Sequence, residues 1–149
     1  NVNAGGKRKF YVHFYTLHIR YTSCVASTSV LTFNKIFTVA MAAVNNMYVS
    51  RSVLLFKNNF RSPDELVKSL RFPVFIKPNN GGSSIGMSKV NSPSEELGKA
   101  IEKAFKEDDQ VLVEEFISWS ELNIGVFKSK GEIIALTITE IISKKDFFD

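Results

Sequence analysis

The chain contains very few of the residues that build disulfides, metal centres and covalent catalytic sites. Its 149 residues include one cysteine and two histidines. Cys24 has no second cysteine to pair with and no histidine pattern beside it, so we interpret it as a structural residue. His13 and His18 lie in an aromatic-rich run without cysteines or carboxylates at metal-ligand spacing. The sequence therefore predicts no metal site among its own residues.

Long apolar runs are also missing. No stretch approaches the ~20 uninterrupted apolar residues that a membrane helix needs, and the first residues lack the apolar core of a signal peptide. The net charge of +4 comes from lysines and arginines that are scattered rather than clustered with aromatic residues, which argues against nucleic-acid binding. We therefore expect a protein of the cytoplasm, with neither a membrane nor a nucleic acid as partner. A polyphosphate ligand would suit the positive charge equally well.

The first third of the chain carries both strand and helix patterns. Residues 9–25 are rich in aromatic and β-branched types in rough alternation, which predicts one or two strands. From Phe33 to Val44 the apolar positions follow helical spacing. This predicts a helix with one buried face, and Asn45-Asn46 supplies its end.

Two Ser-Pro-x-Glu segments give helix-start signals further along. The serine can cap a free backbone N–H, proline fits the first turn, and the glutamate can reach back to the serine. Residues 62–65 predict a short helix to about Leu70, and residues 92–95 predict a helix to about Lys106. The apolar positions of the second helix predict one buried stripe, formed by Leu97, Ala100, Ile101, Ala104 and Phe105.

The remaining apolar segments have the pattern of β-strands. Single strands are predicted at residues 47–56, 72–77, 87–90 and 110–117. Residues 122–141 have the pattern of a hairpin that turns at 129–131. We therefore expect the α+β class, with a mostly antiparallel sheet flanked by helices.

The strongest chemical signal is a glycine-serine loop directly after a lysine, in the segment KPNNGGSSIG at residues 77–86. Glycines let backbone N–H groups approach phosphate oxygens, the hydroxyls add donors, and the lysine ammonium adds a point charge. A Walker A loop places its lysine after the glycines and at a helix start, whereas this loop lies between predicted strands. Composition alone leaves a flexible hairpin of small residues as the alternative.

The longer string FPVFIKPNNGGSSIGMSKV, at residues 72–90, resembles the signature of D-alanine-D-alanine ligases, which are ATP-grasp enzymes. The resemblance extends over about residues 20–149. It implies an ATP-grasp-like fold that is truncated at both ends. Residues 1–30 would then be a remnant of an N-terminal domain or a linker, and residues 31–149 a partial nucleotide-binding domain.

The resemblance assigns roles to residues around the loop. Phe33-Asn34-Lys35 stands where the family opens a helix with a lysine that contacts nucleotide phosphates, so Lys35 joins Lys77 as a phosphate ligand. Gly82, Ser83 and Ser84 would form the phosphate-binding loop. Ser83 is also the catalytic candidate, because in the family this serine helps to hold the first D-alanine together with a glutamate and a tyrosine. Neither of those partners is identifiable in this chain.

A second group of residues is assigned to the adenosine part of the nucleotide. VLVEEFI, at residues 111–117, is similar to the family's adenine-binding strand, with Glu114 near the exocyclic amino group and the backbone around Glu115 and Ile117 at the ring edge. Neighbouring strand residues point to opposite faces, so Glu114 and Glu115 cannot act as a paired acid and base. Glu121 stands where the family binds the ribose hydroxyls. Trp119-Ser120 departs from the family's usual residues and puts the local turn in doubt.

The function implied by the resemblance is that of an ATP-dependent carbon-nitrogen ligase that joins D-alanine for the peptidoglycan of the cell wall. ATP and Mg²⁺ would be the cofactors, with the metal ligands expected beyond Asp149, and D-alanine would bind once the missing domains are supplied. A homodimer is possible. We expect the isolated chain to be inactive. Two alternatives stay open: a non-catalytic nucleotide-binding module, and a non-functional ligase fragment.

Overall fold

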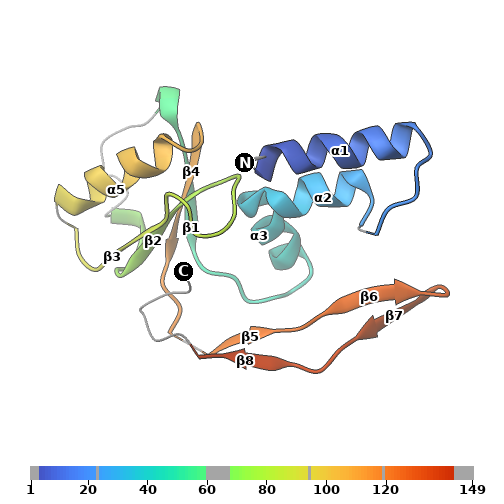
Figure 1. The fold of residues 1–149 in the computed structure, drawn as a ribbon. Helices are drawn as coiled ribbons and strands as arrows, with labels where there is room; N and C mark the ends of the chain where they lie inside the picture. Colours follow the sequence, from blue (N-terminus) through green and yellow to red (C-terminus); the bar gives the residue numbers. More distant parts are fainter. Residues whose placement is uncertain (1–3, 23, 60–67, 94, 119, 143–149) are drawn as a thin grey trace. The chain divides into compact units, whose positions relative to one another are not determined.

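A computed structural model describes residues 4–22, 24–59, 68–93, 95–118 and 120–142. The chain divides into two compact units, Asn1–Phe116 and Ile117–Asp149, and each is described by itself (Figure 1). Helices and antiparallel sheets are both present, so the predicted α+β class is confirmed. The helix start predicted at residues 62–65 lies outside the described residues, whereas Lys68 and Ser69 near its predicted end are helical.

The first unit is built around one antiparallel sheet of four strands in the order β1-β4-β2-β3. Its strands are β1 (Ser52–Phe56), β2 (Val74–Pro78), β3 (Ser88–Val90) and β4 (Gln110–Glu115). The four strands predicted for this part of the sequence are therefore present. β1 is shorter than expected, because residues 47–51 lie outside it and the 3-10 turn η1 (Lys57–Asn59) follows it.

One face of the sheet is covered by helix α5 (Glu95–Phe105), as Figure 1 shows. The five apolar positions predicted as a buried stripe are all buried, so that prediction is confirmed. They pack with alternate residues of the strands, among them Val74 and Ile76 of β2 and Val111 and Val113 of β4. Since strand residues alternate between faces, the residues between them, such as Phe75, Lys77 and Glu114, lie on the opposite face of the sheet.

Three helices precede the sheet: α1 (Ala4–Thr16), α2 (Ala26–Phe33) and α3 (Lys35–Val44). The strands predicted at residues 9–25 are wrong, since α1 continues to Thr16. Phe10 and Phe14, one helical turn apart, have ring centroids separated by 6.2 Å. Such aromatic pairs suit a helix as well as a strand, so the aromatic composition alone misassigned the segment. Helix α2 was not predicted.

Helix α3 confirms the predicted helix but not its predicted burial. None of its residues is buried, and Phe37, Met41 and Val44 are 55%, 48% and 78% exposed. The helical spacing was correct, but no described element covers this face. The predicted end is confirmed, because Asn45 caps the helix and Asn46 adopts a left-handed φ of 59°.

The second unit is a two-stranded antiparallel ribbon. β5 (Glu121–Asn123) pairs with β8 (Thr139–Ile141), and β6 (Val126–Ser129) pairs with β7 (Glu132–Ala135). The chain reverses at Lys130 and Gly131, whose φ angles of 49° and 89° suit a tight hairpin turn. The predicted hairpin and its turning point are therefore confirmed. Within the described ranges, no helix is both long and apolar enough to cross a bilayer.

Candidate functional site

The glycine-serine loop connects β2 to β3, as the sequence predicted, and its backbone is tightly turned. Ser83 and Ser84 both have a φ of 54°, and Gly86 has a φ of 73°. A Cβ atom on Gly86 would lie 2.8 Å from Cγ of Glu107 and 2.9 Å from Cγ of Pro78, so only glycine fits there. Two successive serines in the left-handed region are strained, and such backbone is typical of ligand-binding loops.

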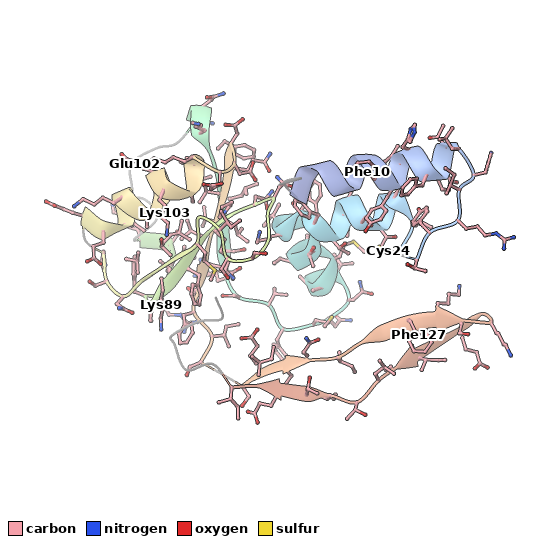
Figure 2. The ribbon with its side chains drawn as sticks, in the orientation of Figure 1. Phe10, Cys24, Lys89, Glu102, Lys103 and Phe127 are labelled. Carbon is pink, nitrogen blue, oxygen red and sulfur yellow. The ribbon has the colours of Figure 1, made fainter. Side chains whose placement is uncertain are left out.

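Helix α5 anchors the far end of this loop. The ammonium of Lys103 donates hydrogen bonds to the backbone oxygen of Met87 at 2.9 Å and to the Ser88 hydroxyl at 3.3 Å. Figure 2 labels Lys103 on α5 and Lys89 on the neighbouring strand β3. The loop is thus held at the point where it re-enters the sheet, while Gly82 and Ser83 at its tip are exposed.

Lys35 reaches the near end of the loop from the first residue of α3. Its Nζ donates hydrogen bonds to the backbone oxygens of Pro78 at 2.8 Å and Gly81 at 3.1 Å. Burial, and then the positive charge of Lys77, lower the pKa of the Lys35 ammonium, against weaker opposing effects of Asp108 and Glu114. An ammonium has three protons to donate, so one remains for an incoming anion.

Lys77 lies on the sheet face opposite α5 and forms an ion pair with Glu114 of the neighbouring strand. Both side chains are largely buried, at 23% and 17% exposure. The Lys77 ammonium also lies 5.1 Å from the ring centroid of Phe75. The structure therefore brings together Lys35, Lys77 and the glycine-serine loop, with Glu114 beside them.

Glu115 points the opposite way from Glu114, as strand alternation requires. Its carboxylate accepts hydrogen bonds from the Arg71 backbone N–H at 2.9 Å and from the Arg71 guanidinium at 3.0 and 3.2 Å. The Arg71 backbone N–H and then its charged side chain hold the pKa of Glu115 below its ordinary value, although burial opposes this. The side chain of Glu115 is thus used in the first unit's own packing.

The other residues selected from the sequence are less enclosed. Ser84 is half-buried, and the hydroxyl of Ser83 has no hydrogen bond to any described residue. Ile117 and Glu121 belong to the second unit, where Glu121 begins β5 opposite Ile141 and is exposed. Trp119 lies outside the described residues.

Sequence reasoning missed a set of polar residues that joins the loop to α3. Asn79, immediately after β2, is fully buried, and its side chain donates a hydrogen bond to Gln110. The neighbouring Asn80 donates hydrogen bonds to the Asp108 carboxylate. These contacts join residues 28 to 46 positions apart, so no local spacing reveals them. The available signal was the pair Asn79-Asn80 itself, since two asparagines directly after a buried strand need hydrogen-bond partners.

Within the described ranges, no three histidine, cysteine or acidic side chains lie close enough together to hold a metal ion. Two ammonium groups beside a turned backbone loop suit the binding of an anion.

Comparison with known proteins identifies the family of the chain. Residues 36–149 match the family described as "D-ala D-ala ligase C-terminus". The chain belongs to the D-alanine-D-alanine ligase family. The D-alanine-D-alanine ligase of Flavobacterium psychrophilum is 41% identical over 133 residues, covering 89% of this chain and 40% of the relative. That of Phocaeicola vulgatus is 37% identical, covering 92% of this chain and 42% of the relative.

Solved structures of the family have the same fold. The VanG D-Ala:D-Ser ligase of Enterococcus faecalis superposes with a TM-score of 0.88 at 30% identity, over 99% of this chain and 43% of that structure. The D-alanine-D-alanine ligase of Helicobacter pylori gives a TM-score of 0.79 at 28% identity, over 91% and 43% of the two chains. The expected ATP-grasp architecture is therefore confirmed. The chain spans about 40% of the length of the curated relatives it matches.

Proposed function

We propose that this chain binds ATP as the nucleotide-binding part of a D-alanine-D-alanine ligase. The observation that carries the proposal is the convergence of Lys35 and Lys77 on one glycine-serine loop, where Lys35 bonds directly to loop carbonyls. The curated relatives bear the name of this ligase. We assign residues 31–149 to the nucleotide-binding domain and residues 1–30 to a remnant of a preceding domain or a linker.

The phosphates of ATP are the groups that these residues suit best. The ammonium groups of Lys35 and Lys77 supply positive charge. The backbone N–H groups around Gly82, Ser83 and Ser84 supply uncharged hydrogen-bond donors. Lys77 is already paired with Glu114. A bound polyphosphate would therefore share the Lys77 ammonium with that carboxylate, which keeps the lysine pre-oriented before the ligand arrives.

The adenosine half is assigned from the resemblance of residues 111–121 to the family. Glu114 would accept a hydrogen bond from the exocyclic amino group of adenine, and the backbone from Glu115 to Ile117 would contact the ring edge. Glu121 would bind the ribose hydroxyls, for which a carboxylate is a suitable acceptor.

The reaction of the complete enzyme would begin with phosphorylation of one D-alanine carboxylate by ATP, followed by attack of a second D-alanine amine on the acyl phosphate. Positioning and neutralisation of phosphate charge carry such a step, and Mg²⁺ would supply part of the charge from ligands outside the described residues. Ser83 would help to hold the first D-alanine. The product would serve the peptidoglycan of the cell wall. A location in the cytoplasm remains our prediction, and the homodimer stays an open alternative.

Calorimetric titration of the chain with Mg-ATP tests the proposal. We expect binding by the unsubstituted chain and its loss in the Lys35→Ala, Lys77→Ala double variant. A Lys99→Ala, Lys106→Ala variant is the matched control, because it removes the same charge from exposed positions on and just after α5. The control should bind as the unsubstituted chain does. Equal binding by all three proteins, or binding by none, would contradict the proposal.

A parallel assay with D-alanine separates binding from ligation. We expect no D-alanyl-D-alanine from the isolated chain, because it spans about 40% of the length of its relatives. Dipeptide production by the 149-residue chain would show that these residues suffice for catalysis and would overturn that expectation.

A further inference from the structure

The N-terminus of α3 is closed by protein groups from two directions. Asn34, its N-cap residue, accepts a hydrogen bond from the Phe37 N–H at 3.2 Å. The Lys35 N–H donates to the backbone oxygen of Asn79 at 3.0 Å, and the Ile36 N–H donates to the Asn79 side-chain oxygen at 3.0 Å. The first three N–H groups of the helix are therefore already occupied, and α3 can contact a nucleotide through the Lys35 side chain but not through its own terminus.

Asn79 connects that helix terminus to the sheet. Its side-chain nitrogen donates to the Gln110 side-chain oxygen at 2.7 Å, and its backbone N–H donates to the Gln110 backbone oxygen at 2.8 Å. The residue is 0% exposed. It follows β2, the strand that carries Lys77, so a single buried side chain bridges the helix that begins with Lys35 and the first residue of β4.

A second set of bonds runs beside the first. The Asp108 carboxylate accepts from the backbone N–H of Asn80 at 2.6 Å and from its side-chain amide at 2.9 Å. The Asn80 side-chain oxygen in turn accepts from the Asn34 amide at 3.3 Å. The loop's entry is thus tied at two successive residues to the helix that carries Lys35.

We propose that Asn79 is a positioning residue for nucleotide binding, which holds Lys35 against the glycine-serine loop and at a fixed place relative to Lys77. Asn80 supports the same arrangement from the adjacent position. The proposal deepens the proposed function and rests on it, because the purpose of the arrangement is to present two ammonium groups to one polyphosphate. It adds Asn79 and Asn80, which have no charge and no assigned ligand contact, to the residues on which the site depends.

The physical reason is that a lysine side chain is long and loses much rotamer freedom when it is fixed. Lys35 is fixed by two bonds to loop carbonyls, and those bonds form only while α3 begins beside Pro78. Without the side chain of Asn79, the Ile36 N–H loses its acceptor, and water must enter or the helix must shift. Either outcome loosens Lys35 while its charge stays in the protein.

Two measurements on the full chain test the inference. The first is calorimetric affinity for Mg-ATP. The second is an NMR titration of the lysine side-chain signals, with Lys35 assigned through Lys35→Arg. Its pKa reports whether Lys35 remains buried against the loop, where it faces Lys77 of β2, Glu114 of β4 and Asp108. The variants are Asn79→Ala and, as a matched control at the other end of α3, Asn45→Ala, which removes an amide bonded to the Met41 carbonyl.

In Asn79→Ala we expect the pKa of Lys35 to rise toward the ordinary lysine value and the affinity for Mg-ATP to fall about tenfold. This is the size implied by loss of the hydrogen bond that joins Asn79 to the Ile36 N–H of α3. Asn45→Ala should change neither. Because Asn79 is buried, Asn80→Ala serves as a second, half-buried variant in case Asn79→Ala fails to fold; it should change both quantities in the same direction by a smaller amount. An unchanged pKa of Lys35 with unchanged affinity, in whichever variant folds, would overturn the inference.

Failure of the proposed function has a different signature. If the unsubstituted chain bound no Mg-ATP while Asn79→Ala still raised the pKa of Lys35, the structural linkage would stand but its role in nucleotide binding would be refuted. A fall in affinity of equal size in Asn45→Ala and Asn79→Ala would also contradict the inference, since any loosening of α3 would then suffice.

Discussion

Helices α3 and α5 have similar apolar spacing but opposite surroundings. The stripe of α5 is buried against the sheet, with Leu97 and Ile101 each 1% exposed. The corresponding face of α3 leaves Phe37 and Met41 about half exposed. The comparison shows that periodicity predicts the helix and its apolar face, whereas burial depends on which element lies opposite. The apolar face of α5 lies against strands β2, β3 and β4. Among the described elements, none covers the apolar face of α3.

The two helices also serve the site in different ways. Helix α5 packs on the strands β2 and β3 that flank the loop, and its Lys103 bonds to Met87 and Ser88 at the end of the loop. Helix α3 contributes through Lys35 in its first turn, whose N–H groups bond to Asn34 and Asn79. We therefore expect substitutions along α5 to affect stability, and those at the start of α3 to affect ligand binding.

The largest expected effect is on the free energy of unfolding, and it should differ between the apolar faces of α5 and α3. Ile101→Ala should lower the free energy of unfolding by about 2–5 kcal/mol, because it leaves a cavity in the core. Phe37→Ala on α3 should lower it by less than about 1 kcal/mol, since its ring is half exposed. Urea denaturation followed by circular dichroism measures both values. Equal losses in the two variants would show that α3 is covered in solution and would break the comparison.

A smaller effect concerns the ion pair between Arg71 and Glu115, the last residue of β4. Glu115→Gln should lower the free energy of unfolding at neutral pH by about 1–3 kcal/mol, since its carboxylate accepts three hydrogen bonds from Arg71. The folded-state pKa of Glu115 is depressed, so this contribution is present above its ordinary value of 4.5 and is lost as the pH falls through the folded-state pKa. Stability measured against pH should therefore fall less steeply in acid for Glu115→Gln.

Glu132→Gln is the control for that experiment, because Glu132 is an exposed glutamate on β7. It should leave both the stability and its acid dependence unchanged. If the two variants behaved alike, the Arg71 contact would have no measurable role in the first unit.

The smallest effect tests the binding role of α3. The pKa of Lys35 is lowered in the free chain, and a bound polyphosphate favours the charged ammonium and raises it again. Affinity for Mg-ATP should therefore be highest below the pKa that Lys35 has in the chain without nucleotide. It should decline as the pH rises through that pKa. We expect a decline of roughly threefold over the pH range in which Lys35 loses its proton, which lies below that of an ordinary lysine.

Lys35→Arg removes this pH dependence if Lys35 is its source, because a guanidinium stays charged throughout the range. Calorimetry at several pH values compares the two proteins. An identical decline in Lys35→Arg would assign the pH dependence to another group and would remove Lys35 from the phosphate site.

Local patterns in the sequence were sufficient for much of the fold. The α5 stripe, the loop between β2 and β3, and the hairpin turn at Lys130-Gly131 all depend on spacing or turn chemistry that a short window contains. The strands predicted at residues 9–25 failed because aromatic residues suit helices and strands alike. The burial of α3 and the bonds of Asn79 could not be predicted, since both depend on residues far away in the chain.

The candidate site followed the same division. Lys77 was selected from the glycine-serine loop that follows it, and Lys35 through the resemblance of its segment. The structure brings both to the loop. The opposite orientation of Glu114 and Glu115 followed from strand alternation and is confirmed by their separate partners, Lys77 and Arg71. The residues that fix the loop to α3 were found only in three dimensions.

The most direct test of a phosphate site at this loop is an amide NMR map of the ¹⁵N-labelled chain during titration with Mg-ADP. We predict that the largest shifts fall on the amides of residues 81–86, with further shifts at Lys35 and around Glu114. The exposed face of α3 around Met41 should be unaffected. Shifts concentrated away from the loop, or the same shifts in the Lys35→Ala, Lys77→Ala variant, would contradict the account.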